Sequence, residues 1–271
     1  MNVRCDDVLE LKYLQSHMVV VDLLGSGNAF LPSGRLHSFL VIDKHIIIDC
    51  PPTALASLRI AGISPADIDT ILITHVHGDH VFGFPFLLLE RKYISDREGL
   101  KPLTVAGSKG VRDRLTHLCN LAYPGSLEEI IESINWVDTP EVEGWKMERF
   151  EVLHDPEVDP HGWMLTNEQG WSMIHSGDSG PCEELWNRIG KCKFAVVEMG
   201  VPEYVQTEHH HKPSDINELA NKFPQTKFVI THTYIDSDYK ILTKEVPIFP
   251  ENVIHGEDNM RFELDSVGSI C

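Results

Sequence analysis

The stretch Thr74–His80 reads THVHGDH and places three histidines and an aspartate within residues 75–80. It follows an apolar run, Ile68–Thr74, that is typical of a buried strand, and it precedes an apolar stretch that we expect to be helical from Pro85 to Tyr93. Imidazole and carboxylate groups are good ligands for zinc and similar divalent ions. The pattern therefore predicts a metal site at the end of a strand.

The spacing of these four side chains predicts two ions rather than one. Alternate residues of an extended chain point the same way, so we expect His75 and His77 to face one ion. Gly78 gives the backbone freedom for a sharp turn, after which Asp79 and His80 face a second ion. Histidine is frequent here, at 15 of 271 residues. Even so, chance produces H-x-H-x-D-H only about 0.003 times in such a chain.

Strand-like and helix-like segments alternate along the chain, which indicates an α+β or α/β fold. No composition break divides it, so we expect one domain over residues 18–271, preceded by a segment of unknown role, 1–17. We also expect a two-residue hairpin turn at Asp43-Lys44. The other expected strands are Met18–Leu24, Ser38–Ile42, His45–Asp49, Leu103–Ala106, Trp145–Leu153, Gly162–Leu165, Trp171–His175, Phe194–Glu198 and Phe228–Thr231. The other expected helices are Pro51–Ala61, Lys109–Leu121, Leu127–Ile134, Cys182–Ile189 and Ser214–Lys222.

Composition restricts the partners. The chain carries 41 Asp and Glu against 23 Lys and Arg, a formal net charge of −18. Such a surface repels polyphosphate, which argues against extended nucleic acid and leaves a small anionic substrate. The longest apolar run, Val81–Leu89, is far shorter than a membrane span. The first residues lack the basic-then-apolar order of a signal peptide, so we expect a cytoplasmic protein with no membrane contact.

The THVHGDH stretch resembles the signature loop of the metallo-β-lactamase fold superfamily, and the resemblance covers roughly Val19 to Leu264. It implies a four-layer αβ/βα sandwich with a dinuclear metal site at one edge. In that superfamily a later His completes the first site, an Asp bridges both ions and a His near the end completes the second. By their order, His154, Asp178 and His232 match these positions, each at or just after the end of a predicted strand.

The resemblance thus implies seven metal ligands: His75, His77, Asp79, His80, His154, Asp178 and His232. Some positions have competitors in the sequence: His161 and His175 for His154, and His209, His210, His211 and His255 for His232. Two divalent ions are expected, with zinc in first place and manganese or iron as alternatives, because His and Asp ligands serve all three. Asp49, which ends a predicted strand, is expected to orient a metal-bound His.

Within the superfamily, Gly25–Val41 (GSGNAFLPSGRLHSFLV) resembles the G-x-G-x-A-x-P-x-x-x-R-x-x-S segment of the ribonuclease Z branch. That branch uses a His as proton donor and a Glu as its support; here His211 and Glu198 match, with His209 and His210 as close rivals. Its long RNA-binding arm has no counterpart, because only 23 residues separate His154 from Asp178. The resemblance also implies a possible homodimer.

These observations predict a metal-dependent hydrolase. Two divalent ions lower the pKa of water and polarise a substrate oxygen, while Asp79 binds metal and accepts a hydrogen bond from the attacking water. We expect a phosphodiesterase acting on a small or cyclic nucleotide-like diester or a short RNA end. The alternative is a carboxyl-ester hydrolase acting on a lactone, thioester or β-lactam. A binding module without catalysis is a third, weaker reading, because no expected ligand position is substituted.

Overall fold

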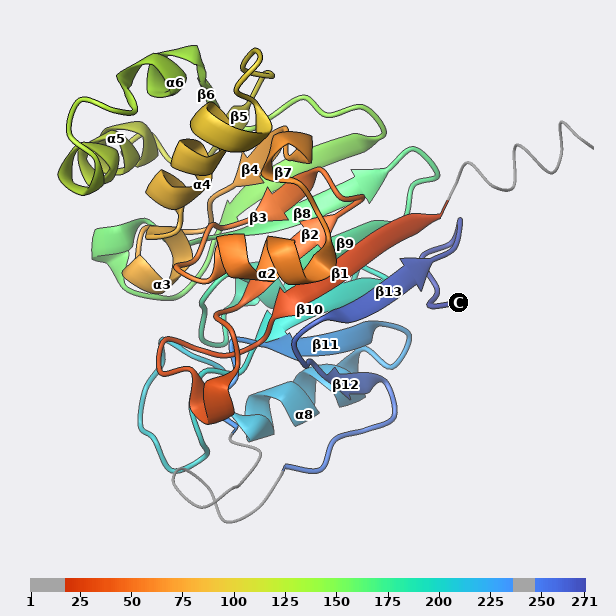
Figure 1. Ribbon diagram of the computed structural model, residues 1–271. Helices are drawn as coiled ribbons and strands as arrows, with labels where there is room; N and C mark the ends of the chain where they lie inside the picture. The colour runs from red at the N-terminus through yellow and green to blue at the C-terminus, as the bar shows by residue number, and fades with distance from the viewer. Residues whose placement is uncertain (1–17, 236–246) are drawn as a thin grey trace, which may run out of the picture.

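The computed structural model describes residues 18–235 and 247–271, so the expected N-terminal segment, 1–17, lies outside the described residues. Within the described part, two β-sheets stack face to face, and helices cover the outer face of each (Figure 1). This is the expected four-layer αβ/βα sandwich, and the α+β class is confirmed. None of the helices in the described part is both long and apolar enough to cross a membrane.

The first sheet has the strand order β13-β1-β2-β3-β4-β5-β6 and the second has the order β12-β11-β10-β9-β8-β7. The strands of the first sheet are β1 (Val19–Gly25), β2 (Phe39–Ile42), β3 (Ile46–Ile48), β4 (Thr70–Leu72), β5 (Thr104–Ala106), β6 (Asn135–Val137) and β13 (Met260–Leu264). Those of the second are β7 (Trp145–Glu151), β8 (His161–Asn167), β9 (Ser172–His175), β10 (Phe194–Glu198), β11 (Lys227–Thr231) and β12 (Val253–His255).

Helices α2, α4 and α5 pack on the first sheet, and α7 and α8 pack on the second (Figure 1). The α-helices are α2 (Ala54–Ala61), α3 (Gly78–Val81), α4 (Phe84–Glu90), α5 (Val111–Ala122), α6 (Glu128–Ser133), α7 (Glu183–Ile189) and α8 (Pro213–Lys222). Shorter or irregular turns are η1 (Pro32–Gly34), η2 (Pro65–Asp67), η3 (Arg91–Ser95) and η4 (Pro156–Val158).

Apolar side chains on both faces of the central strands explain the continuous β-branched runs in the sequence. On β2, Leu40 and Ile42 point into the layer between the sheets, whereas Val41 points under the helices of the first sheet. On β10, Val196 faces the other sheet and Val197 faces α7 and α8. A strand buried on both faces carries no polar alternation, which is why it reads as an unbroken apolar run.

Several local expectations need correction. The hairpin turn has three residues, 43–45, because Ile42 pairs with Ile46. Its Asp43 and Lys44 have left-handed φ values of 49° and 65°. Gly78 is not in that region of φ but begins the short helix α3. A Cβ on Gly78 would lie 2.8 Å from the ring of the exposed Phe82, so a larger residue at position 78 would require that ring to move. Strands β6, β12 and β13 were not expected.

The sheet topology brings distant loops to one edge. Strands β3 to β6 are parallel to each other, and so are β9 to β12. The carboxyl ends of parallel strands meet at a common edge, where α/β folds place their sites. The loops that follow β4, β9 and β11 carry residues 75–80, 178 and 232, and the loop after β7 carries residue 154.

Candidate metal centre

The loop after β4 is fixed by a buried carboxylate before any metal is considered. Asp49, at the end of β3, accepts hydrogen bonds from the Thr74 N–H and hydroxyl, both at 2.8 Å. The Thr74 hydroxyl oxygen in turn lies 3.0 Å from His75 Nδ1, and Asp49 Oδ2 lies 2.7 Å from His80 Nδ1. When each Nδ1 carries the proton, each histidine presents Nε2 as a lone-pair donor. Asp49 therefore orients two histidines, as metal-binding sites require.

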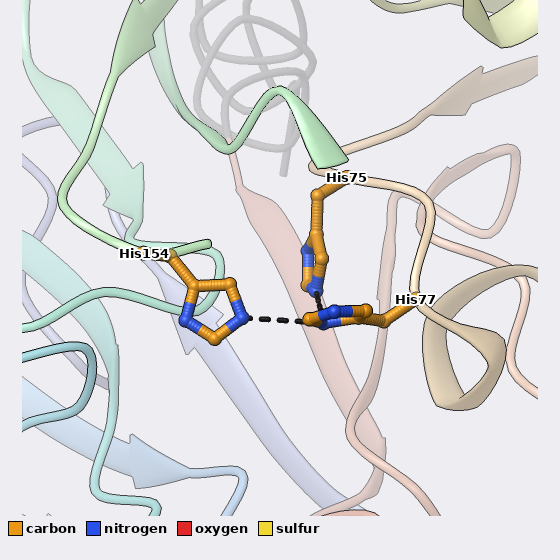
Figure 2. Close-up of side chains that lie close together, drawn as sticks. All are labelled: His75, His77 and His154. Carbon is orange, nitrogen blue, oxygen red and sulfur yellow. Dashed lines mark hydrogen bonds between the residues drawn. The ribbon is translucent and has the colours of Figure 1, made fainter. Parts of the chain in front are cut away.

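Three histidines form the first ligand group (Figure 2). The Nδ1 atom of His77 lies 3.1 Å from His75 Nε2 and 3.2 Å from His154 Nε2. His154 comes from the loop after β7, and its Nδ1 donates to the backbone carbonyl of His209 at 3.0 Å. That bond leaves Nε2 of His154 free to face the other two rings. The group has the donor set of a zinc site with an open position.

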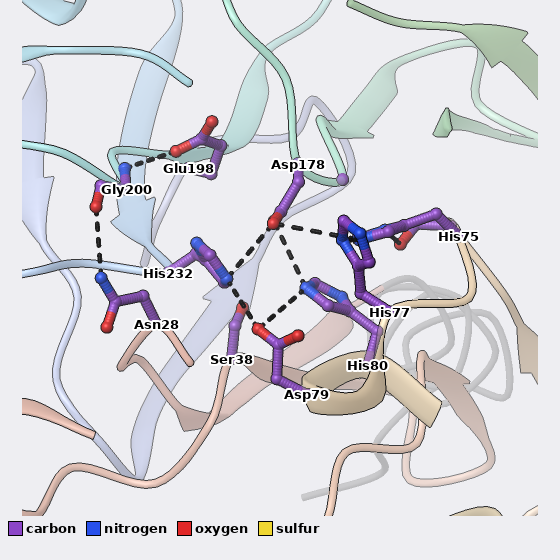
Figure 3. Close-up of polar contacts among 12 residues, drawn as sticks. Asn28, Ser38, His75, His77, Asp79, His80, Asp178, Glu198, Gly200 and His232 are labelled. Atoms are coloured by element: carbon purple, nitrogen blue, oxygen red, sulfur yellow. Dashed lines mark hydrogen bonds and ion pairs between the residues drawn. The ribbon is translucent and has the colours of Figure 1, made fainter. Parts of the chain in front are cut away.

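Asp79, His80 and His232 form the second group, and Asp178 lies between the two groups (Figure 3). His232 Nε2 lies 3.2 Å from Asp79 Oδ2 and 3.3 Å from Asp178 Oδ2. Asp178 Oδ1 is 3.4 Å from His80 Nε2, and Oδ2 is 3.9 Å from His75 Nε2. One carboxylate thus reaches ligands of both groups. The structure brings all seven expected ligands into a single cluster.

The residues present fit a metal. The Nε2 atom of His80 is buried and has no hydrogen-bond partner in the described part of the chain. A buried polar atom without a partner is costly, and a cation held by His80, Asp79 and His232 would satisfy it. The donor set, imidazole nitrogens with carboxylate oxygens, suits zinc and also manganese or iron.

The charges of the cluster show which groups could bind a cation directly and which must first lose a proton. Burial acts to lower the pKa of His80, but the Asp178 and Asp49 carboxylates outweigh it and hold that pKa well above its usual value, so His80 would release a proton when a cation binds. Burial, followed by the neighbouring imidazoles, holds the pKa of His75 well below its usual value, so this ring is neutral and has a free lone pair. Burial would raise the pKa of Asp178, but the imidazoles of His232 and His80 outweigh it and keep that pKa well below its usual range. Burial also acts to raise the pKa of Asp79, but the hydrogen bond to His232 and the charges of the His80 and His232 imidazoles together outweigh it and lower that pKa. Both carboxylates are therefore anionic.

Three of the competing histidines, His161, His175 and His255, have other partners, whereas His210 lies within reach of ligands from both groups. His161 Nδ1 donates to the carbonyl of Asp159 at 2.8 Å, and His175 Nδ1 accepts from the Gly177 N–H at 3.0 Å. Burial lowers the pKa of His175 to about 4. The ring of His255 packs on Phe249, with centroids 5.0 Å apart. None of these three joins the ligand groups that the described residues form.

The structure contradicts the choice of His211 over His210 as the partner of Glu198. The His211 ring is fully buried, and its Nε2 accepts from the Trp186 indole N–H at 3.2 Å. His210 Nδ1 instead lies 3.0 Å from Glu198 Oε1. The His210 ring is 4.9 Å from His154 and 5.9 Å from His232, centroid to centroid, so it lies beside both ligand groups.

The pKa values of His210 and His211 also favour His210 as the charged partner of Glu198. Burial lowers the pKa of His211, which makes its ring neutral. Burial also acts to lower the pKa of His210, but the Glu198 carboxylate outweighs it and raises that pKa to about 9. Glu198 Oε1 additionally accepts from the backbone N–H groups of Ser179 and His211, both at 3.1 Å. The carboxylate is therefore held in place independently of either imidazole.

Comparison with known proteins identifies the class. Residues 44–233 match the family model of the β-lactamase superfamily domain, which is more than half of the chain, and the chain belongs to this family. Ribonuclease Z of Methanosarcina mazei is 23% identical over 307 aligned residues, covering 91% of this chain and 98% of the relative. The expected resemblance is confirmed, and the chain is a metal-dependent hydrolase.

Two solved structures share the fold. The metallo-β-lactamase fold protein YhfI from Bacillus subtilis has a TM-score of 0.69 at 12% identity, with 91% of this chain and 99% of YhfI covered. A diphosphatase of the PhnP family has a TM-score of 0.68 at 15% identity, with 94% and 98% covered. At such identities these two similarities establish the architecture and no more.

Proposed function

We propose that this hydrolase is a phosphodiesterase that uses two divalent metal ions, zinc by preference, and that acts on a small or cyclic nucleotide-like diester or a short RNA end. The first ion would be held by His75, His77 and His154. The second would be held by Asp79, His80 and His232, with Asp178 shared between them. When bound, such a pair of ions polarises a phosphoryl oxygen and makes water a nucleophile near neutral pH.

The observation that carries this proposal is the His210–Glu198 pair beside the ligand cluster. Cleavage of a diester expels a strongly basic alkoxide, which needs a proton from a positioned acid. His210, kept charged by Glu198, is that donor, and it replaces His211 in the role. Asp79 would have a second task besides metal binding, because its carboxylate could accept a hydrogen bond from the attacking water and orient it. Hydrolysis of a thioester depends less on such an acid, because the thiolate that leaves is a much weaker base than an alkoxide.

The size of the substrate follows from what lies between the ligands. The residues between His154 and Asp178 form η4, β8, β9 and the short turns that join them, which leaves no room for a long RNA-binding arm. The net charge of −18 also opposes a long polyanion. The similarity to ribonuclease Z supports diester chemistry on RNA, and the two preceding points narrow it to a small diester or a short RNA end.

A substrate panel tests the proposal. The purified protein is loaded with zinc or manganese and assayed on bis-p-nitrophenyl phosphate, a cyclic nucleotide and a lactone. We expect hydrolysis of the two diesters, and we expect His75→Ala to abolish it. Hydrolysis of the lactone alone would contradict the proposal and support the carboxyl-ester alternative. Purified protein that holds no stoichiometric metal would instead support a binding module.

A further inference from the structure

The metal ligand His232 lies at a turn of the backbone rather than in a strand. It follows the last residue of β11, and its φ of 48° is in the left-handed region that L side chains rarely adopt. Such a conformation persists only where surrounding structure holds it. The nearest support comes from the loop between β1 and β2, residues 26–38. There the Ser38 hydroxyl is hydrogen-bonded to the Thr231 hydroxyl at 2.7 Å, and both are buried.

The same loop holds the residue on the other side of His232. The Thr233 N–H donates to the Ser26 carbonyl at 2.8 Å, and the Thr233 carbonyl accepts from the Asn28 N–H at 3.1 Å. The side-chain amide of Asn28 donates to the Gly200 carbonyl at 3.2 Å, as Figure 3 shows. The backbone therefore enters and leaves His232 through contacts with one loop, and these contacts hold the backbone conformation from which the imidazole extends. The Nδ1 atom of that imidazole is buried and has no hydrogen-bond partner among the described residues.

A single carboxylate closes that loop. Asp258 Oδ1 accepts from both the N–H and the hydroxyl of Ser26, each at 2.8 Å, and Asp258 Oδ2 accepts from the Leu36 N–H at 2.7 Å. Arg35 adds to the closure, because its Nη1 donates to the Ser26 hydroxyl oxygen at 2.7 Å and to the Gly256 carbonyl at 3.1 Å. Asp258 thus joins the two ends of the loop.

Asp258 is well placed in the fold for this task. It lies between β12, at the edge of the second sheet, and β13, which pairs with β1 in the first sheet. The chain crosses between the sheets at this point, next to the end of β1. We propose that Asp258 is a positioning residue for the second metal ion, acting through the loop 26–38 on His232. This inference rests on the proposed dinuclear site.

The proposal predicts an effect on one ion only. The loop contacts reach His232, a ligand of the second ion, whereas the first ligand group is fixed by other bonds, such as that of His154 to the His209 carbonyl. Loss of a group hydrogen-bonded directly to a metal ligand weakens metal binding by about 10–100-fold, and Asp258 acts at one remove from His232, so we expect the lower end of that range, about tenfold. Asp258→Ala should therefore weaken the binding of the second ion by about that factor and leave the binding of the first ion unchanged.

The experiment measures metal binding rather than activity. Metal-free protein is titrated with cobalt in competition with a chelator, and the two dissociation constants and the visible absorption of each cobalt ion are recorded. His232→Ala shows which binding event belongs to the second group. Asp258→Asn serves as a second variant of similar shape, since its side chain keeps one acceptor oxygen, and it decides the question if the alanine variant does not fold.

Asp265→Asn is the matched control, because Asp265 also accepts from two backbone N–H groups, of Val267 and Ser269, but lies beyond β13. We expect both ions to bind to this control as they do to the wild type. If both Asp258 variants bound both ions as the wild type does, or if the binding of both ions were weakened equally, the proposed role of Asp258 would be refuted. Wild-type protein that binds fewer than two ions would refute the proposed dinuclear site, and with it this inference.

Discussion

Replacing His210 and His211 in turn by glutamine separates catalysis from stability at adjacent positions. His210 contacts Glu198 beside the metal ligands, whereas His211 contacts Trp186 inside the fold. Backbone N–H groups hold Glu198 in both variants, so neither substitution removes its other partners. We expect His210→Gln to lose catalysis and also some stability at neutral pH, because the charged ring that pairs with the buried Glu198 is removed, and we expect His211→Gln to lose stability while it keeps catalysis.

The magnitudes follow from these contacts. A positioned general acid contributes about 10²–10⁴ in rate, so His210→Gln should lower kcat by that factor on a substrate with an alkoxide leaving group. This corresponds to about 3–5 kcal/mol of activation free energy. On bis-p-nitrophenyl phosphate, whose leaving group needs no proton, the loss should be under about tenfold. His211→Gln disturbs one buried hydrogen bond, which costs about 1 kcal/mol of unfolding free energy.

The assay compares kcat for the two leaving groups in the wild type and both variants, with metal content measured in each. Thermal unfolding monitored by circular dichroism gives the stability. Equal losses on both substrates in His210→Gln would show that His210 positions the substrate or a metal and does not donate a proton. A selective loss on the alkoxide substrate in His211→Gln would show that the structure assigns the wrong histidine.

Three further outcomes are expected. Chelation should abolish hydrolysis and lower the melting temperature, and zinc should restore both, because the ligand cluster is built around cations. Gly83→Ala should lower the free energy of unfolding by about 2 kcal/mol or more, because the added Cβ would lie 1.9 Å from the Pro51 carbonyl oxygen. Gly99→Ala is the control, because its Cβ would meet no atom within 4 Å and should change the stability little. Chemical denaturation measures both. The hydrogen bond to Asp69 raises the pKa of His45, so the wild type should be more stable than His45→Gln below about pH 6.5. That difference should fade as the pH rises through the raised pKa, and it should stay within about 0.5 kcal/mol because both groups are partly exposed.

The local sequence pattern is sufficient to predict some of the candidate metal ligands and insufficient to predict the others. The four ligands of residues 75–80 are neighbours in the sequence, so their residue types and close spacing are enough to predict a metal site there. His154, Asp178 and His232 come from separate loops, so only the resemblance to a family could select them from other histidines and aspartates. The strands β6, β12 and β13 are short and partly exposed. Their pairing with distant strands defines them, and that pairing leaves no strong local pattern.

The choice between His210 and His211 shows most clearly what a local sequence pattern cannot predict. Adjacent residues in an extended segment point to opposite sides, so one of the two must face the metals and the other must face the fold. Which one faces the metals depends on where Trp186 of α7 lies, and no local pattern around residue 211 reports that. Asp258 is hidden for a different reason, because its partners are mostly backbone N–H groups that every sequence provides.

An acidic protein and an anionic substrate are compatible if the positive charge is local. The proposed ligand set contains two carboxylates, Asp79 and Asp178, and no lysine or arginine. Two divalent ions would bring four positive charges against those two negative ones, so the loaded cluster would be positive while the rest of the surface stays negative. A charged His210 adds to this on the same side. Attraction for a phosphate then depends on the bound ions and reaches only a short distance. A small diester that fits at the edge of the sheets gains from it, whereas a long polyanion would also meet the acidic surface around it.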